Sequence, residues 1–308
     1  MAAGERFGRQ VRQLADNLLV ATLLGSVLLL ASVSCAQSTP AASPDPARLR
    51  FETVASFDRY VRLTDTRNEI ELKRGSALLW IDALPETQRS EAYAALKSGE
   101  VQIHQLSTPD NGKPIVCPGG MIHHWVGVVF IPGAKLDEVL GVLEDYDHQS
   151  TYYSPDVERS KIESRDGDHF RVFLRFRRHK VITVVLDTEH DVHYFHDVPG
   201  RAHSRSTTVR IAEVENPGKS DEREKPPGDD GGYLWRMETW WRMEERDGGV
   251  YVQSEAASLT RDIPTGLGWL VGPFVTSIPK ETLLFTLDAT RKTVMAKPKS
   301  SPEAKNSR

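Results

Sequence analysis

The sequence predicts an α+β fold in which a curved antiparallel sheet packs around a long C-terminal helix. Two features of the apolar pattern indicate this. From Val101 onward, apolar residues recur at about every second position through segments that turn residues separate, which is typical of antiparallel strands joined by hairpins. Beyond residue 266 the period becomes helical, and apolar residues follow one side of the chain as far as Val294.

Composition sets the broad class of the protein. Its 308 residues fit one large domain or two small ones. A hydrophobic content of 39% and a charged content of 27% are typical of a globular protein. The net charge of -4 offers no basic surface, so we expect no nucleic-acid partner. The two cysteines, Cys35 and Cys117, cannot form a disulfide framework.

The N-terminus carries an apolar run at residues 18–33, LLVATLLGSVLLLASV. Arg6, Arg9 and Arg12 precede it, which is the charge pattern of a secretory signal. The run is short for a membrane-spanning helix of about 20 residues. We therefore expect residues 1–36 to be a signal peptide or membrane anchor. The folded part is then exported, either periplasmic or anchored and facing the periplasm or the exterior.

The form of this export segment has three alternatives. Small residues at Ser34 and Ala36 favour cleavage before Gln37. Cys35 is the alternative, as the acceptor of a bacterial lipoprotein signal. An uncleaved anchor is the third, and all three place the folded part beyond a membrane.

Two predicted helices separate the N-terminus from the main domain. Residues 37–48 are rich in Ser, Pro and Ala and are expected to be a linker. Residues 49–100 have a helical pattern, and a second helix is expected after Pro85. Because about fifty residues bury little surface alone, these helices are predicted to pack on the main domain. The first has an apolar face of Phe51, Val54, Phe57, Tyr60 and Val61.

The main domain is predicted to span residues 101–296. It begins with a short strand from Val101 to Leu106 and a longer one at 122–131, which Pro132 ends. The following residues carry the broad apolar stripe of a helix that lies on a sheet. The stripe comprises Leu136, Val139, Leu140, Val142, Leu143 and Tyr146.

Further strands are expected in series at 169–177, 181–186, 206–214, 233–243 and 250–259. In the fourth of these, Tyr233, Trp235, Met237, Trp241 and Met243 are predicted to share one face, with Arg236, Glu238, Arg242 and Glu244 on the other. Residues 216–232 contain no aliphatic or aromatic side chain, so a mobile surface loop is predicted there. The tail at 297–308 is expected to be disordered.

The last predicted element is the long helix after Gly266. We expect Pro279 in its first turn, where a missing N–H has no helical partner. Gly272-Pro273 is expected to mark a kink or a new start.

This order of elements resembles that of the helix-grip proteins, which include START domains and polyketide cyclase and dehydrase-like proteins of the SRPBCC superfamily. Three stretches carry the resemblance. Residues 128–134, VVFIPGA, running into 142–147, VLEDYD, resemble the first strand and helix of that family. Residues 153–160, YSPDVERS, resemble its second strand, and 258–264, SLTRDIP, resemble its junction with the final helix. The likeness covers about 122–294 and suggests a bacterial exported member.

The resemblance implies a tunnel between the sheet and the final helix that takes lipids, sterols or similar molecules. The expected function is binding or transport of a hydrophobic, lipid-like molecule in the cell envelope, without a cofactor. Its expected partners are that ligand and a membrane surface. The alternative is a cofactor-independent enzyme of the cyclase or dehydratase type, because one fold hosts many functions.

Large apolar side chains on the predicted sheet face and final helix are the candidate ligand-binding residues, with core packing as the alternative. Aromatic rings and polarizable Met suit a loosely specified apolar ligand. The set is Trp125, Phe170, Phe176, Trp235, Met237, Trp241, Met243, Arg261, Trp269 and Phe274. The arginines of these strands, Arg171, Arg175, Arg236 and Arg242, are expected on the opposite, outer face.

Histidines are the only group whose spacing suggests a metal. His190, His193 and His196 recur every third residue, but alternation along a strand would turn His193 away from the other two. A solvated strand end without a metal is therefore predicted, and a metal site on a local turn is the alternative. The same rule makes the neighbours His123 and His124 point apart.

No motif marks a catalytic centre. The sequence has no Gly-rich phosphate loop, no CxxC pair and no G-x-S-x-G turn. If the protein were a cyclase or dehydratase, an acid or base with a tuned pKa would have to line the cavity. Asp262, His124 and Tyr233 are the candidates for that role, and binding is the preferred interpretation.

Overall fold

The structure is a computed structural model that describes residues 47–75, 78–179, 183–262 and 268–297, with the side chains of 268–276 left out. The predicted export segment, most of the linker and the C-terminal tail therefore lie outside the described residues. The part of the chain after Pro44 forms one compact unit, so the predicted N-terminal helices belong to the same body as the sheet.

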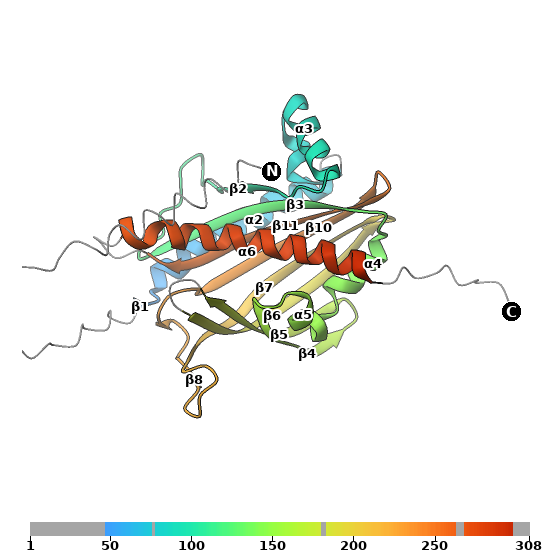
Figure 1. The fold of residues 1–308 in the computed structure, drawn as a ribbon. Coiled ribbons are helices and arrows are strands. Elements are labelled where there is room, and N and C mark those ends of the chain that lie inside the picture. The colour runs from blue at the N-terminus through green and yellow to red at the C-terminus, as the bar shows by residue number, and fades with distance from the viewer. Residues whose placement is uncertain (1–46, 76–77, 180–182, 263–267, 298–308) are drawn as a thin grey trace, which may run out of the picture. The chain divides into compact units, whose positions relative to one another are not determined.

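The centre of this unit is an antiparallel sheet, nine-stranded in the described part of the chain. Neighbouring strands follow the order β2-β3-β11-β10-β7-β6-β5-β4, and β8 pairs with β7 (Figure 1). The strands are β2 (Gln102–Gln105), β3 (Gly120–Pro132), β4 (Val157–Asp166), β5 (His169–His179), β6 (Thr183–Val198), β7 (Arg201–Glu215), β8 (Arg223–Glu224), β10 (Arg236–Arg246) and β11 (Gly249–Arg261).

The hairpin from β10 to β11 shows how local sequence sets strand pairing. Asp247 and Gly248 have φ angles of 57° and 74°. Two successive positive φ angles fit a type I′ turn, whose twist matches that of the flanking strands. The turn aligns Arg246 with Gly249, and the pairing continues without a shift to Arg236 and Leu259.

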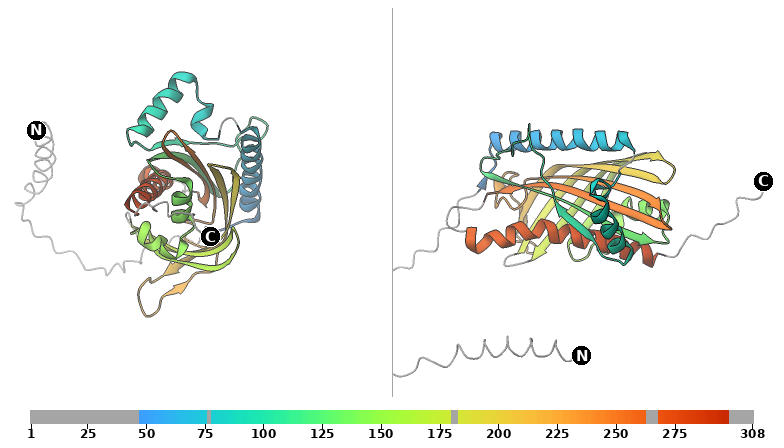
Figure 2. Two further views of the ribbon diagram at one scale, coloured as in Figure 1. Left: turned by 90° about the vertical axis from the view of Figure 1, so that its right-hand side faces the viewer. Right: turned by 90° about the horizontal axis from the view of Figure 1, so that it is seen from above.

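Helix α6 (Gly268–Ala296) covers one face of the sheet, here called the inner face (Figure 2). It packs chiefly against β3, and α4 (Leu136–Leu143) and α5 (Gln149–Tyr152) also contact it. The contact with β3 is close at Gly127, where an added Cβ would lie 2.6 Å from Leu287 Cδ1. The structure therefore confirms the predicted fold class, an antiparallel sheet packed around a long C-terminal helix.

Helix α2 (Phe51–Arg74) lies on the opposite, outer face of the sheet (Figure 2). Its predicted apolar face is only partly right. Phe57 and Tyr60 are buried, but Phe51 is 86% exposed, and the buried side also includes Thr53, Thr64 and Asn68. These polar residues can be buried because each has a hydrogen-bond partner: the Pro118 carbonyl for Thr53, the Tyr60 carbonyl for Thr64, and Arg242 of the sheet for Asn68.

Arg242 is the deepest of those partners, with only 2% of its surface exposed. Its guanidinium donates to Asn68 Oδ1 at 2.6 Å, to Glu71 Oε2 at 2.7 Å and to the Leu78 carbonyl at 2.7 Å. The outer face predicted for Arg242 is confirmed, but this side chain is covered by α2. Arg175 is likewise buried and makes a bidentate pair with Asp187, both contacts at 2.6 Å.

A second buried chain of hydrogen bonds runs from α2 into the sheet. Tyr60 Oη lies 2.7 Å from His124 Nδ1, and His124 Nε2 lies 2.8 Å from Glu255 Oε1. Arg67 forms an ion pair with the same carboxylate. Burial favours protonation of Glu255, but the hydrogen bond from His124 and the charge of Arg67 outweigh it and keep its pKa below the usual value.

The other N-terminal elements pack on the same outer face. Helix α3 (Glu86–Lys97) and the 3₁₀ helix η1 (Trp80–Ala83) form an apolar cluster with Phe130 and Tyr251 of the sheet. The second helix predicted after Pro85 is thus confirmed, with Ala92 and Leu96 buried.

Two segments differ from the predicted elements. The predicted loop at 216–232 contains β8 and β9 (Asp229–Asp230), and β9 pairs with β1 (Ala47–Arg48). Backbone pairing needs no apolar side chain, which is why composition did not reveal these strands. Pro279 lies inside α6 and not in its first turn, and the helix also continues through Gly272-Pro273, because propensity is a weak guide once a helix is part of a larger fold.

No helix in the described ranges is both long enough and apolar enough to cross a membrane.

Truncation of Arg242 should destabilise the protein strongly. Arg242→Ala leaves Asn68, Glu71 and the Leu78 carbonyl without their buried partner, and breaking such a pair costs about 3–5 kcal/mol. Denaturant unfolding should show this loss in the free energy of unfolding. Arg171→Ala, on a partly exposed arginine of the same sheet, is the control and should change the free energy of unfolding by less than about 0.5 kcal/mol. Equal effects of the two substitutions would contradict the structural role of the Arg242 contacts.

Candidate functional site

A patch on the inner face remains partly accessible to solvent, although it lies in the middle of the sheet. Trp125, Ala256, Thr239 and Ser206 lie directly beside one another on β3, β11, β10 and β7. All four are only partly buried. Met237 and Trp241, which flank Thr239 on the same face of β10, are also partly buried. These six residues are called the inner-face patch.

Small side chains surround the large ones in this region. Trp241 is paired with Ser204 on one neighbouring strand and with Ser254 on the other. The Ser204 hydroxyl is buried and has no hydrogen-bond partner among the described residues. An unpaired buried hydroxyl is costly, so it is a natural contact for a water or a polar ligand atom.

Another part of the inner face is tightly packed. Met243, Val129 and Val252 are fully buried in one apolar cluster with Leu283 and Leu287 of α6. Residues of α4 and the aromatic rings of Tyr146, Tyr153 and Tyr194 belong to the same cluster. The inner face is therefore divided into a filled core and a partly open patch.

His190 lies on the inner face of β6 beside the patch. Thr188 Oγ1 donates a hydrogen bond to the Leu174 carbonyl at 2.9 Å. Its oxygen must therefore accept a hydrogen bond from the N–H of His190 Nε2, which lies 2.8 Å away. Burial lowers the pKa of His190 to about 4. The ring is therefore neutral at pH 7 and leaves Nδ1 as a hydrogen-bond acceptor.

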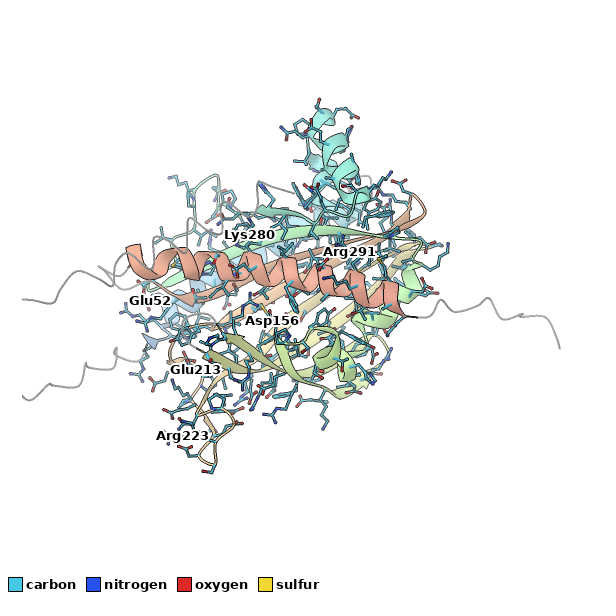
Figure 3. All side chains as sticks on the ribbon, in the orientation of Figure 1. Glu52, Asp156, Glu213, Arg223, Lys280 and Arg291 are labelled. Atoms are coloured by element: carbon cyan, nitrogen blue, oxygen red, sulfur yellow. The ribbon has the colours of Figure 1, made fainter. Side chains whose placement is uncertain are left out.

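His123 repeats this arrangement on β3. Its Nε2 lies 3.0 Å from Thr260 Oγ1, which itself donates to the Arg261 carbonyl at 3.1 Å. Burial lowers the pKa of His123 as well. Thus two neutral imidazoles and several hydroxyls provide the polar groups of the inner face. Lys280 of α6 lies beside the inner-face patch, with Nζ 5.9 Å from the Trp125 ring centroid (Figure 3).

The structure brings together three of the predicted ligand-binding residues, Trp125, Met237 and Trp241, in the inner-face patch. Phe176 lies on the inner face of β5, partly buried, with its ring 6.2 Å from that of His190. Phe170 and Met243 are fully buried in the packed core.

The remaining members of the predicted set lie elsewhere. The common face predicted for Trp235 and Met237 is wrong, because Trp235 packs under α2 with Phe57 and Trp240. It precedes the start of β10, so strict alternation does not reach it. Arg261 lies at the end of β11, where Nη1 donates to the Gly231 carbonyl at 3.3 Å. The side chains of Trp269 and Phe274 lie outside the described residues.

Sequence reasoning did not single out Ser206, Thr239, Ala256 or His190 as site residues. Small and polar residues in a strand are ordinary, and nothing in their local pattern separates them from surface positions. Only the pairing of four strands shows that they lie side by side. A run of small inward positions on neighbouring predicted strands is the signal that would have found them.

The residues proposed for an enzyme do not meet on the inner face. His124 belongs to the hydrogen-bonded chain under α2. Tyr233 is 45% exposed, and Asp262 is exposed at the end of β11. His123 and His124 point to opposite faces of the sheet, as predicted.

The three regularly spaced histidines are also separated. His190 faces inward, while His193 lies on the outer face, where its ring stacks on that of His169 at 3.9 Å. His196 lies 3.8 Å from Asp168. A different group is brought together: one ligand atom from each of His169, Asp191 and His193 lies within 4.8 Å of the other two.

Two surface hollows in the described ranges lie away from the inner-face patch. One is lined by residues 48–51, 54 and 226–229, and the other by residues 56, 59, 110, 111 and 113–116. Both adjoin the first turns of α2, and neither includes a residue of the patch.

No protein-family model and no curated protein matches the sequence. Solved structures similar to this chain include the STAR-related lipid transfer protein from Xanthomonas axonopodis, with 19% identity and a TM-score of 0.41 over 63% of this chain and 98% of that one. Human STARD10 has 11% identity and a TM-score of 0.41 over 68% and 81%. The Zhui aromatase/cyclase from a Streptomyces species has 14% identity and a TM-score of 0.36 over 57% and 94%. These likenesses concern the fold alone. The structure itself has the architecture that the sequence predicted, an antiparallel sheet packed around a long C-terminal helix.

The neutral state of His190 predicts a loss of stability in acid. In the unfolded chain His190 becomes protonated below about pH 6.5, whereas in the folded chain it becomes protonated only near pH 4. The stabilisation is therefore present above pH 6.5 and is lost as the pH falls, by about 2 kcal/mol between pH 7 and pH 5. Denaturant unfolding at pH 7 and pH 5 gives the change in the free energy of unfolding between the two pH values. This decrease should be about 2 kcal/mol smaller in His190→Gln than in the wild type. His179→Gln, on an exposed histidine, should behave as the wild type, and an identical pH response of His190→Gln would contradict the prediction.

Proposed function

We propose that the protein binds a hydrophobic, lipid-like small molecule against the inner face of the sheet, beneath α6. The observation that carries this proposal is the partial exposure of Trp241, Thr239 and Trp125 at the centre of that face. In a filled core, central positions facing a packed helix would be buried, as Met243 and Val129 are. This partial exposure supports the proposal that a ligand can lie in front of the patch.

The chemistry of the patch suits such a molecule. Trp125, Trp241 and Met237 offer large, polarizable apolar surfaces, and covering them gains about 25 cal/mol per Å² of apolar area. The unpaired Ser204 hydroxyl and the neutral His190 provide hydrogen bonds without a charge. An apolar molecule with an uncharged oxygen, such as a hydroxyl or carbonyl group, matches this combination.

We further propose that the protein carries or senses this ligand in the cell envelope. The apolar run at 18–33 with its preceding arginines supports an exported or membrane-anchored location. This run lies outside the described residues, so the proposal of location rests on the sequence pattern.

A cyclase or dehydratase has less support than a binding protein. General acid–base catalysis works best when the catalytic pKa is near the operating pH. Burial lowers the pKa of His190 to about 4, which makes it a weak base at neutral pH. None of Asp262, His124 and Tyr233 lies on the inner-face patch.

Filling the patch should abolish ligand binding without unfolding the protein. In Thr239→Phe the new ring occupies the space in front of the sheet, so binding should fall at least about tenfold. If that space is empty, the free energy of unfolding should change by less than about 1 kcal/mol, because no overpacking occurs. The measurements are mass spectrometry of organic extracts of the purified full chain, displacement of a fluorescent fatty-acid probe, and denaturant unfolding.

Val209→Phe is the matched control, because Val209 lies on β7 but is exposed. It should leave both binding and stability unchanged. The proposal fails if the wild-type extract is empty and the protein ignores fatty acids, phospholipids and isoprenoids. It also fails if Thr239→Phe costs about 1–3 kcal/mol or more, which is the mark of an already filled core.

A further inference from the structure

Two strands on the outer face bring three potential metal ligands together. His169 of β5 is paired directly with His193 of β6. Asp191 precedes His193 by two residues, so the alternation of a strand places both side chains on the same face. Both strands have neighbours on each side within the sheet, so their backbones are held by hydrogen bonds. The three side chains thus project from a fixed support.

The ligand atoms converge on one point. His169 Nε2 lies 3.0 Å from Asp191 Oδ1, and His193 Nδ1 lies 3.5 Å from the same oxygen. Zinc bonds of about 2.0–2.2 Å in tetrahedral geometry place neighbouring ligand atoms about 3.3–3.6 Å apart. The two separations from Asp191 Oδ1 are close to this range, so the carboxylate and both imidazoles can share one ion once the rings have turned.

The surroundings leave room for the ion and orient the carboxylate. The side chains of His169, His193 and Asp191 are 40%, 48% and 32% exposed, so water can reach the cluster and supply further ligands. Arg171 Nη1 lies 3.8 Å from Asp191 Oδ2. It thereby holds the second carboxylate oxygen and leaves Oδ1 facing the two imidazoles, as outer partners of metal ligands often do.

The two rings are nearly parallel, with an interplanar angle of 9°. The lone pair of an imidazole nitrogen lies in the ring plane, so both rings must splay apart by rotation about χ2 to share an ion. Their exposure leaves them free to rotate. Metal binding should therefore replace the stacked pair by a splayed one.

We propose that His169, Asp191 and His193 bind one divalent transition-metal ion, with zinc as the favoured metal and water at the fourth position. Imidazole nitrogens favour zinc and other divalent first-row transition metals. Calcium and magnesium prefer oxygen ligands. The cluster lies on the face opposite the inner-face patch. The metal site is therefore independent of the proposed lipid-like ligand.

Metal titration of the purified, tag-free full chain tests this proposal. After removal of metal, zinc should bind in competition with a chromogenic chelator at one equivalent per chain through these residues. Cobalt at the same site should show the intense visible absorption of a tetrahedral ion and not the weak bands of aqueous cobalt. Loss of an outer-shell partner typically costs about 10- to 100-fold in metal affinity, and loss of a direct ligand should cost at least as much. His169→Ala, His193→Ala and Asp191→Asn should therefore each weaken zinc binding at least about tenfold.

The matched control is His196→Ala, because His196 is an exposed histidine of the same strand outside the cluster. It should bind zinc with an affinity within about twofold of the wild type, a change far below the loss expected for a ligand. Circular dichroism should show that all variants are folded. The proposal is overturned if the wild type takes up no equivalent of zinc. It is equally overturned if the double variant His169→Ala/His193→Ala retains that equivalent, or if His196→Ala weakens binding as much as the ligand variants do.

Discussion

The buried ionic contacts between α2 and the outer face of the sheet are the constraint on which the rest of the structure depends. Arg242 and Glu255 are charged groups that α2 removes from water, and each is stable there only with its partners in place. These contacts turn the even-numbered residues of β10 toward α2. Because side chains alternate along a strand, the same register turns Trp241 and Met243 toward α6.

The packing of α2 on the outer face explains why the inner face has both a tightly packed part and a partly exposed part. The sheet is stabilised from outside by α2 and at one end by the apolar cluster with α6 and α4. The centre of the inner face does not have to be filled for the fold to hold together. It carries the small residues Ser206, Thr239 and Ala256 between two tryptophans. A firm frame around a partly open centre is compatible with the ligand binding proposed above.

The outer face is likewise divided. Helix α2 contacts its central strands, where charged residues are buried in pairs. On β5 and β6, by contrast, His193 is exposed, and His169 and Asp191 are partly exposed. His169 donates to Asp191 at a site that water can reach, where a metal ion can replace the proton, whereas His124 under α2 has both nitrogens engaged by buried partners. The same residue type therefore serves stability in one region and offers ligand chemistry in another, according to what covers it.

The sequence alone determined the fold class, the succession of most strands and helices, and the opposite directions of His123 and His124, because periodicity and turn residues are local properties of the chain. It also indicated Trp125, Met237 and Trp241 as possible site residues. Tertiary structure decided that Trp235 faces α2, that Thr239 and Ser206 lie beside those residues, and that Arg242 is buried. It also joined His169 to Asp191, which are 22 residues apart. Cross-strand register and the covering of each face are long-range contacts, and no local pattern contains them.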